Sequence, residues 1–216
     1  PLPPIENESA KALTAHDWEA FFAAPTLVEE MRAVGASAGG KAPAKRGVVI
    51  AGNDWPHASI DRLAASLGWP VLADALSPAR LRSGGAGSVV AAYDAILRDP
   101  RAAEALRPEI VVILGEVPTS KALRAWLASV DAETVYVTAK SDNRDSLHAR
   151  ARTLVARPEE VEALPFAFEP APREWTAAWA RAEAAAQAVL ARVADEPAFE
   201  GAFTRVITET LTSAQA

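Results

Sequence analysis

Cysteine is absent from this sequence of 216 residues, and histidine is scarce. Without a thiol, the chain cannot use a cysteine nucleophile, and it cannot bind zinc or an iron–sulfur cluster through thiolates. Its three histidines, His16, His57 and His148, do not have the spacing of metal ligands, so a zinc hydrolase is not expected. The lack of cysteine also fits a reducing compartment, and we expect a cytoplasmic protein.

Long apolar runs and an excess of positive charge are missing as well. No run approaches the roughly 18 apolar residues of a transmembrane helix. Residues 1–13 have neither the basic start nor the apolar core of a signal peptide. A formal net charge of -6 argues against a nucleic-acid-binding surface. The Walker and paired-histidine motifs do not occur. The Gly-x-Ser-x-Gly string at residues 35–39 lies in a stretch rich in glycine and alanine that predicts a linker, so hydrolase and P-loop assignments are without support.

Short apolar runs that alternate with helical patterns are what the sequence does contain. The runs read as buried strands because they carry β-branched residues without polar alternation. This order predicts an α/β protein with a doubly wound parallel sheet, flanked by helices at both ends. We expect strands over residues 46–53, 69–74, 109–115, 133–139 and 153–157, and helices over 58–68, 88–99, 119–130, 173–194 and 199–211.

The composition divides the chain into four parts. Residues 1–45 are expected to form an interdomain arm with entry helices, and residues 46–157 the α/β central domain. Residues 158–196 are expected to be a proline-punctuated linker and a long helix. The apolar stripe after Pro197 has nothing after it to cover, so residues 197–216 are interpreted as the start of a missing C-terminal domain.

Ligands of doubly wound sheets bind at the carboxyl ends of the strands, and two segments there could bind an anion. Residues 83–87, Ser-Gly-Gly-Ala-Gly, could cradle a phosphate, but they do not directly follow a strand, which favours a flexible loop. Thr119, Ser120 and Lys121 follow the clearest strand and begin a helix. Their hydroxyls, the helix N–H groups and an ammonium could form an anion site. The simpler alternative is a helix cap beside a solvated lysine.

Two further groups of side chains could form sites, but each has a simpler explanation. Arginines could gather into a basic cluster, although surface arginines are usually solvated; these are Arg80, Arg82 and Arg98. Acidic side chains and a histidine could act as acid, base or metal ligand, although their spacing is more typical of helix capping; these are Asp142, Asp145 and His148.

The run IVVILGEVPTSKALRAWLASV at residues 110–130 resembles the central domain of a thiamine diphosphate-dependent family of menaquinone biosynthesis. This family is the 2-succinyl-5-enolpyruvyl-6-hydroxy-3-cyclohexene-1-carboxylate synthases. The same pattern is echoed by RGVVIAG at 46–52, GWPVLADALSPARLRSG at 68–84 and AYDAILR at 92–98. The resemblance covers nearly the whole chain, but only about the middle third of such an enzyme.

The resemblance implies a transferase that joins decarboxylated 2-oxoglutarate to isochorismate, with thiamine diphosphate and Mg as cofactors. The family's Gly-Asp-Gly…Asn motif is not in this sequence, so we expect the cofactors to bind to domains absent here and this segment to contain no catalytic residue. The isolated chain is then expected to be inactive and to carry no cofactor. Within the complete enzyme, an oligomer, it is expected to position substrate. By resemblance, the substrate-binding residues are Lys121, Ser120 and Arg124, with Ser120 either orienting a carboxylate or capping the helix.

This sequence departs from the family pattern at two places. Some members carry two adjacent basic residues where this chain has Lys121 and Ala122, so Arg124 is taken as the substitute for the second one. Asp145 and Ser146 stand where the family has Asp-Pro. Two alternatives stay open: a free-standing nucleotide- or flavin-binding α/β module, and a regulatory domain that binds a metabolite.

Overall fold

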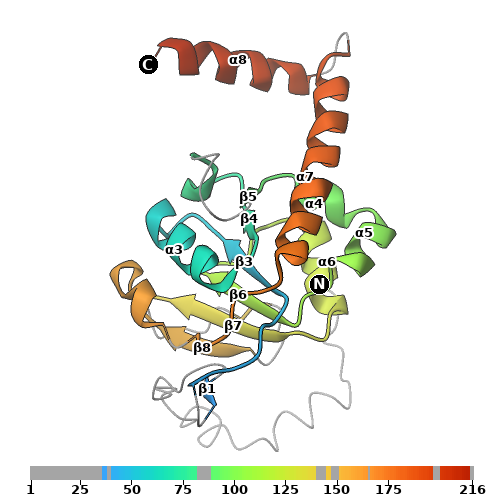
Figure 1. Ribbon diagram of the computed structural model, residues 1–216. Coiled ribbons are helices and arrows are strands. Elements are labelled where there is room, and N and C mark those ends of the chain that lie inside the picture. The colour runs from blue at the N-terminus through green and yellow to red at the C-terminus, as the bar shows by residue number, and fades with distance from the viewer. Residues whose placement is uncertain are drawn as a thin grey trace, which may run out of the picture.

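A six-stranded sheet forms the centre of the computed structural model, which describes residues 36–37, 40–81, 89–139, 145–146, 151–164, 166–196 and 200–214. Its strands run in the order β5-β4-β3-β6-β7-β8, and all pairs are parallel (Figure 1). Their bounds are β3 Gly47–Ala51, β4 Val71–Ala73, β5 Val89–Val90, β6 Ile110–Leu114, β7 Glu133–Thr138 and β8 Arg152–Val155. The chain turns to the other side of β3 after β5, so the prediction of a doubly wound α/β domain is confirmed.

The two central strands have the composition that burial on both faces requires. β3 reads GVVIA and β6 reads IVVIL, and every residue of both strands is buried. They pair in register from Gly47 opposite Ile110 to Ala51 opposite Leu114. An apolar strand without polar alternation needs a cover on each face, and the helices supply it.

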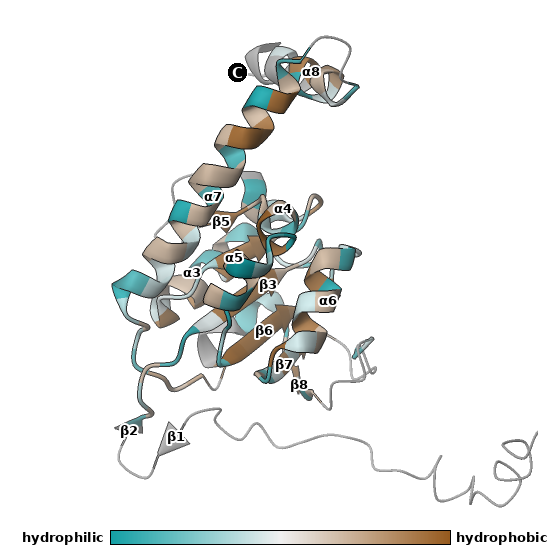
Figure 2. Cartoon of the chain, turned by 90° about the vertical axis from the view of Figure 1, so that its right-hand side faces the viewer, coloured by the Kyte–Doolittle hydropathy of each residue, from teal (hydrophilic) through white to brown (hydrophobic). Residues whose placement is uncertain are grey.

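Helices lie on both sides of the sheet (Figure 2). α3, His57–Leu67, covers one face and ends at Gly68, whose φ of 64° allows the left-handed C-cap. α4, α5 and α6 lie together on the other face, at Tyr93–Leu97, Pro100–Ala105 and Lys121–Ser129. Two 3₁₀ helices, η1 at Pro78–Leu81 and η2 at Pro158–Ala163, and a small antiparallel pair, β1 at Ala36–Ser37 with β2 at Gly40–Lys41, complete this part.

The predicted helix over residues 88–99 is wrong in its first half. Val89 and Val90 instead form β5, which pairs in parallel with β4 at the edge of the sheet. The two β-branched residues gain a strand partner there, and the helix begins only at Tyr93. α5 is not among the predicted helices; Pro100 occupies its first turn, behind an Asp99 cap.

The long helix α7, Arg173–Ala194, has the predicted bounds, and its first turns belong to the core. Trp175 and Trp179 are buried in the same hydrophobic cluster as the strands. The Trp175 indole N–H donates to the carbonyl of Gly47 over 2.8 Å, and Trp179 packs edge-on against Trp126 of α6. These contacts attach the start of α7 to the sheet domain.

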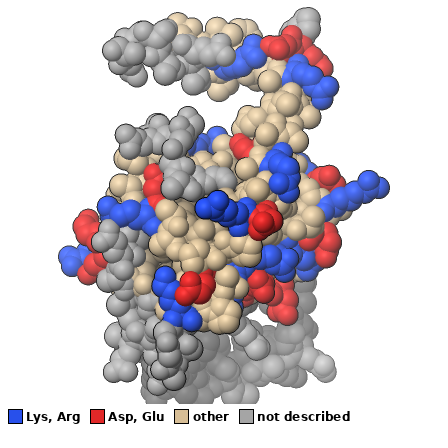
Figure 3. Space-filling model, viewed as in Figure 1, with Lys and Arg blue, Asp and Glu red and all other residues tan. Residues whose placement is uncertain are grey.

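The outer half of α7 and the helix α8, Gly201–Ala214, stand away from the body (Figures 1 and 3). Arg205 of α8 pairs with Asp195 after the end of α7 over 2.7 Å. The predicted apolar stripe is confirmed on α8 and exposed, with Phe203 71% accessible and Val206 and Ile207 each 56% accessible. Phe199, which was expected to begin it, lies outside the described residues. None of the helices in the described ranges combines the length and apolar character needed to cross a bilayer.

Candidate functional site

The loop between β6 and α6 leads from the sheet to the predicted anion-binding residues. β6 ends at Leu114, and the chain turns at Gly115, whose φ of 80° is strained for a residue with a side chain. Ser120 then caps α6, because its hydroxyl accepts a hydrogen bond from the Leu123 N–H over 3.1 Å. The capping role predicted for Ser120 is therefore present, and Lys121 is the first residue of the helix.

The topological switch point, between β3 and β6, is occupied by a tryptophan. Trp55 follows β3 and is only 2% exposed. It lies against Gly115, since a Cβ there would be 3.6 Å from its ring, and a Cβ at Gly52 would be 3.1 Å from the carbonyl oxygen of Glu116. The two loops that would flank a bound nucleotide in such a fold are thus packed on each other and on Trp55.

A carboxylate on α4 connects the start of α6 to an arginine. The Ser120 hydroxyl donates to Asp94 Oδ1 over 2.5 Å, and Arg98 Nε donates to Asp94 Oδ2 over 2.8 Å. The hydrogen bond from Ser120, followed by the one from Arg98, lowers the pKa of Asp94. Asp94 therefore stays ionised at neutral pH, and the Ser120 hydroxyl has its proton engaged within the protein.

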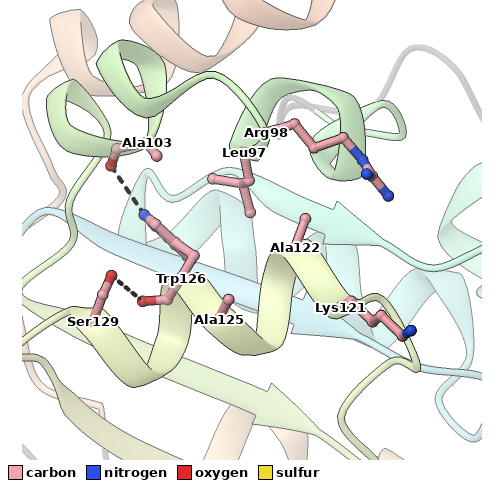
Figure 4. A pocket seen from close by; sticks show the side chains of 8 residues that line it. All are labelled: Leu97, Arg98, Ala103, Lys121, Ala122, Ala125, Trp126 and Ser129. Atoms are coloured by element: carbon pink, nitrogen blue, oxygen red, sulfur yellow. Dashed lines mark hydrogen bonds between the residues drawn. The ribbon is translucent and has the colours of Figure 1, made fainter.

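Lys121 lies at one end of a groove between α6 and the helices α4 and α5. The groove has a volume of about 610 Å³ and is lined by Leu97, Arg98, Ala103, Lys121, Ala122, Ala125, Trp126 and Ser129. Figure 4 shows the cationic ends of Lys121 and Arg98 at the same end of the groove, with Trp126 and Ser129 toward the other. The Trp126 indole N–H donates to the carbonyl of Ala103 over 3.0 Å, which fixes the floor. The groove thus combines an apolar floor with two cations at one end, which we call its mouth.

Arg124, predicted as the second substrate-binding cation, is directed at its own loop. Its Nε donates to the carbonyl of Pro118 over 3.1 Å, and its Nη2 to the carbonyl of Val117 over 3.3 Å. Nη1 lies 3.4 Å from the hydroxyl of Ser146. The guanidinium therefore holds the loop that leads into Lys121, and it does not line the groove.

The other arginine and acidic candidates do not gather into a site within the described part. Arg80 donates to the carbonyls of Ala73 and Ala91, over 3.1 and 2.7 Å, and so ties β4 to the segment after β5. Asp145 accepts from the Ala151 N–H over 3.4 Å. Among the described residues, no group of three or more acidic or histidine side chains could hold a metal ion. Arg82, Asp142, His148 and residues 83–87 lie outside this part.

Asp94 and Trp126 are the site residues that sequence reasoning missed. Asp94 and Ser120 are 26 positions apart, on different helices, and no motif links them. The sequence suggests Arg98 only as a member of a basic cluster with Arg80 and Arg82, or as a solvated surface arginine. Its spacing of four residues from Asp94 within a helical pattern is the signal that could have indicated an ion pair.

Comparison with known proteins adds to this geometry. A family model described as the middle domain of thiamine pyrophosphate matches residues 36–216. A protein of Thermosynechococcus vestitus is 42% identical over 139 residues, which are 61% of this chain and 24% of that protein. One of Acaryochloris marina is 36% identical over 161 residues, 68% of this chain and 28% of its own length. Both bear the name 2-succinyl-5-enolpyruvyl-6-hydroxy-3-cyclohexene-1-carboxylate synthase, and the chain spans about a quarter of each.

Proposed function

Since the chain belongs to the middle-domain family of thiamine pyrophosphate enzymes, we propose that it is the central domain of a 2-succinyl-5-enolpyruvyl-6-hydroxy-3-cyclohexene-1-carboxylate synthase. The identities of 42% and 36% to proteins of that name support this proposal. The whole enzyme would join decarboxylated 2-oxoglutarate to isochorismate in the cytoplasm, as an oligomer. The central domain would contribute to it by holding substrate in place, without activity of its own.

Thiamine diphosphate supplies the carbanion chemistry in enzymes of this class. The described residues do not fit the diphosphate and its metal ion, because they contain no cluster of carboxylate or histidine ligands. We therefore propose that the cofactor and Mg bind to other parts of the enzyme. What remains for this chain is the recognition of acidic substrates.

Lys121 carries the substrate-binding part of the proposal. Its side chain is exposed at the mouth of the groove and has no hydrogen bond or ion pair with any described residue. It begins α6, where the partial positive charge of the helix N-terminus adds to that of the ammonium. Both proposed substrates carry carboxylates, and a cation held in this way would attract one. Ser120 and Arg124 would support Lys121 by capping the helix and by fixing the loop before it.

The test is the substitution Lys121→Ala in the complete enzyme. We expect KM for one of the two substrates to rise by about 10–100-fold, the loss typical of one charge-assisted hydrogen bond, while the fold is kept. Lys41→Ala is the matched control, because Lys41 is also exposed but lies on β2, away from the groove. Unchanged kinetics for both substrates would leave Lys121 as a solvated lysine beside a helix cap.

The isolated chain provides a second test. Supplied with thiamine diphosphate, Mg, 2-oxoglutarate and isochorismate, it should form no product. Turnover by the isolated chain would contradict the proposal that the central domain is inactive alone.

A further inference from the structure

Arg98 lines the same groove as Lys121, but it comes from the opposite wall. Lys121 begins α6, whereas Arg98 follows the last residue of α4, and both cationic ends lie at the same end of the groove (Figure 4). The Arg98 side chain is 68% exposed, so an incoming group can reach it. Two helices from one face of the sheet thus each bring a cation to one place.

Asp94 holds Arg98 in a way that leaves most of its donors available. The carboxylate accepts from Nε alone, over 2.8 Å, and no other described residue accepts from the guanidinium. The four N–H bonds on Nη1 and Nη2 remain, and this planar edge matches the two oxygens of a carboxylate. Because Asp94 also accepts from Ser120, one side chain sets the position of Arg98 relative to the start of α6.

The charges at the mouth of the groove do not cancel. Arg98 and Lys121 are positive and Asp94 is negative, so the three side chains carry one net positive charge. One carboxylate neutralises it. The floor behind them is apolar, formed by Leu97, Ala122, Ala125 and Trp126. The complementary ligand is a carboxylate attached to a compact, largely carbon skeleton.

We propose that Arg98 is the second substrate-binding cation of this site, in place of Arg124. A substrate carboxylate binds between the Nη groups of Arg98 and the ammonium of Lys121, and Asp94 is the positioning residue that holds Arg98 through Nε. This inference deepens the proposed function and rests on it. It explains how a chain with alanine at position 122 presents two cations, because the second one comes from α4.

The experiment compares Arg98→Gln, Lys121→Gln and the double variant in the complete enzyme. Each single change should raise KM for the same substrate by about 10–100-fold, with a smaller effect on kcat. The double variant should lose less than the product of the two single effects, because both residues bind one carboxylate. Arg98→Lys should not restore KM, since a lysine has neither the Nε–H that binds Asp94 nor the paired edge.

Arg101→Gln is the matched control, because Arg101 is an exposed arginine of α5 that does not line the groove. Thermal unfolding of every variant checks that the fold is kept, which is expected for a side chain as exposed as that of Arg98. A raised KM in Lys121→Gln with wild-type kinetics in Arg98→Gln overturns the inference and leaves the proposed function intact. Wild-type kinetics in both variants overturns the substrate-binding role proposed for Lys121, and the inference with it. Independent effects that multiply in the double variant overturn the shared carboxylate.

Discussion

The indole of Trp69 lies so close to the backbone of Gly47 that a Cβ at position 47 would overlap the ring. Trp69 is fully buried, its N–H donates to the carbonyl of Lys45 over 2.9 Å, and it packs against Phe168 with ring centroids 6.0 Å apart. The glycine that begins β3 is therefore explained by the ring beside it. No unusual backbone angle is involved at Gly47, because among the described residues the glycines with positive φ are Gly68 and Gly115.

Gly47→Ala should destabilise the fold by about 1–3 kcal/mol, the usual cost of an added methyl group in a filled core. Urea unfolding would measure this free energy. Adding Trp69→Phe, which removes part of the ring, should make the double variant lose less than the sum of the two single changes. A Gly47→Ala variant as stable as the wild type would show that the indole can move away at no cost.

Replacing Trp175 or Trp179 by phenylalanine should have unequal effects, although both are buried on the same helix. Trp175 donates to the carbonyl of Gly47, whereas the N–H of Trp179 is buried without a hydrogen-bond partner among the described residues. Trp175→Phe leaves a buried carbonyl without its donor, and Trp179→Phe removes a donor that has no partner. We expect Trp175→Phe to be more destabilising by about 1–2 kcal/mol in urea unfolding. Equal losses would contradict this reading of the two indoles.

Neither tyrosine of the chain should ionise near pH 10 while the protein is folded. Burial, followed by the charge of Asp145, raises the pKa of Tyr136 to about 12. Burial, then the charge of Asp74, raises the pKa of Tyr93 as well, and the Tyr93 hydroxyl donates to Asp74 over 3.1 Å. These are the only two tyrosines in the sequence. The ultraviolet absorbance of tyrosinate should therefore rise only as the chain unfolds.

The sign of the linked effect on stability follows from these raised pKa values. An unfolded tyrosine loses its proton near pH 10, while the folded Tyr136 keeps it up to about pH 12. The contribution of Tyr136 to the free energy of unfolding is fully present below pH 10. It is lost as the pH rises, by about 2 kcal/mol at pH 12. Tyr136→Phe should flatten this part of the pH dependence. A tyrosinate signal near pH 10 in folded protein would contradict the prediction.

Amide exchange should be fast in α8 and slow in the first turns of α7. Phe203, Val206 and Ile207 of α8 are mostly exposed, and a helix of this length is marginal without packing. Trp175 and Trp179 attach the start of α7 to the core instead. Hydrogen–deuterium exchange on a strictly monomeric sample would compare the two helices. Strong protection of α8 in that sample would contradict the prediction that this helix is only marginally stable by itself.

The sheet could be predicted because its signals are local. Each central strand is a short β-branched run, and the bounds of α7 follow from Pro172 before it and the alanine-rich stretch within it. β5 could not be predicted in the same way, because Val89 and Val90 become a strand only when β4 lies beside them. A two-residue strand carries no periodicity of its own.

The candidate site could be predicted only along one helix. Ser120 and Lys121 follow from the position of a strand and a helix start, and the structure places Ser120 as the cap. Arg124 points back at its own loop, which depends on carbonyls that become exposed where β6 ends. The contribution of Asp94 and Arg98 required the packing of α4 on α6, which is a long-range contact with no signature in the sequence.

The hydrogen bond from Trp175 to Gly47 joins residues that are 128 positions apart. A ribosome that adds about 5–20 residues per second makes the second of these residues roughly 6–26 s after the first. Until then the carbonyl of Gly47 in β3 lacks the hydrogen bond from the Trp175 indole, and one side of the nascent sheet lacks the start of α7. The core of the nascent domain therefore stays incomplete, with part of its apolar interior exposed to water, until a segment made long after the central strands has been synthesised. Chaperone binding during synthesis would be most useful in that interval.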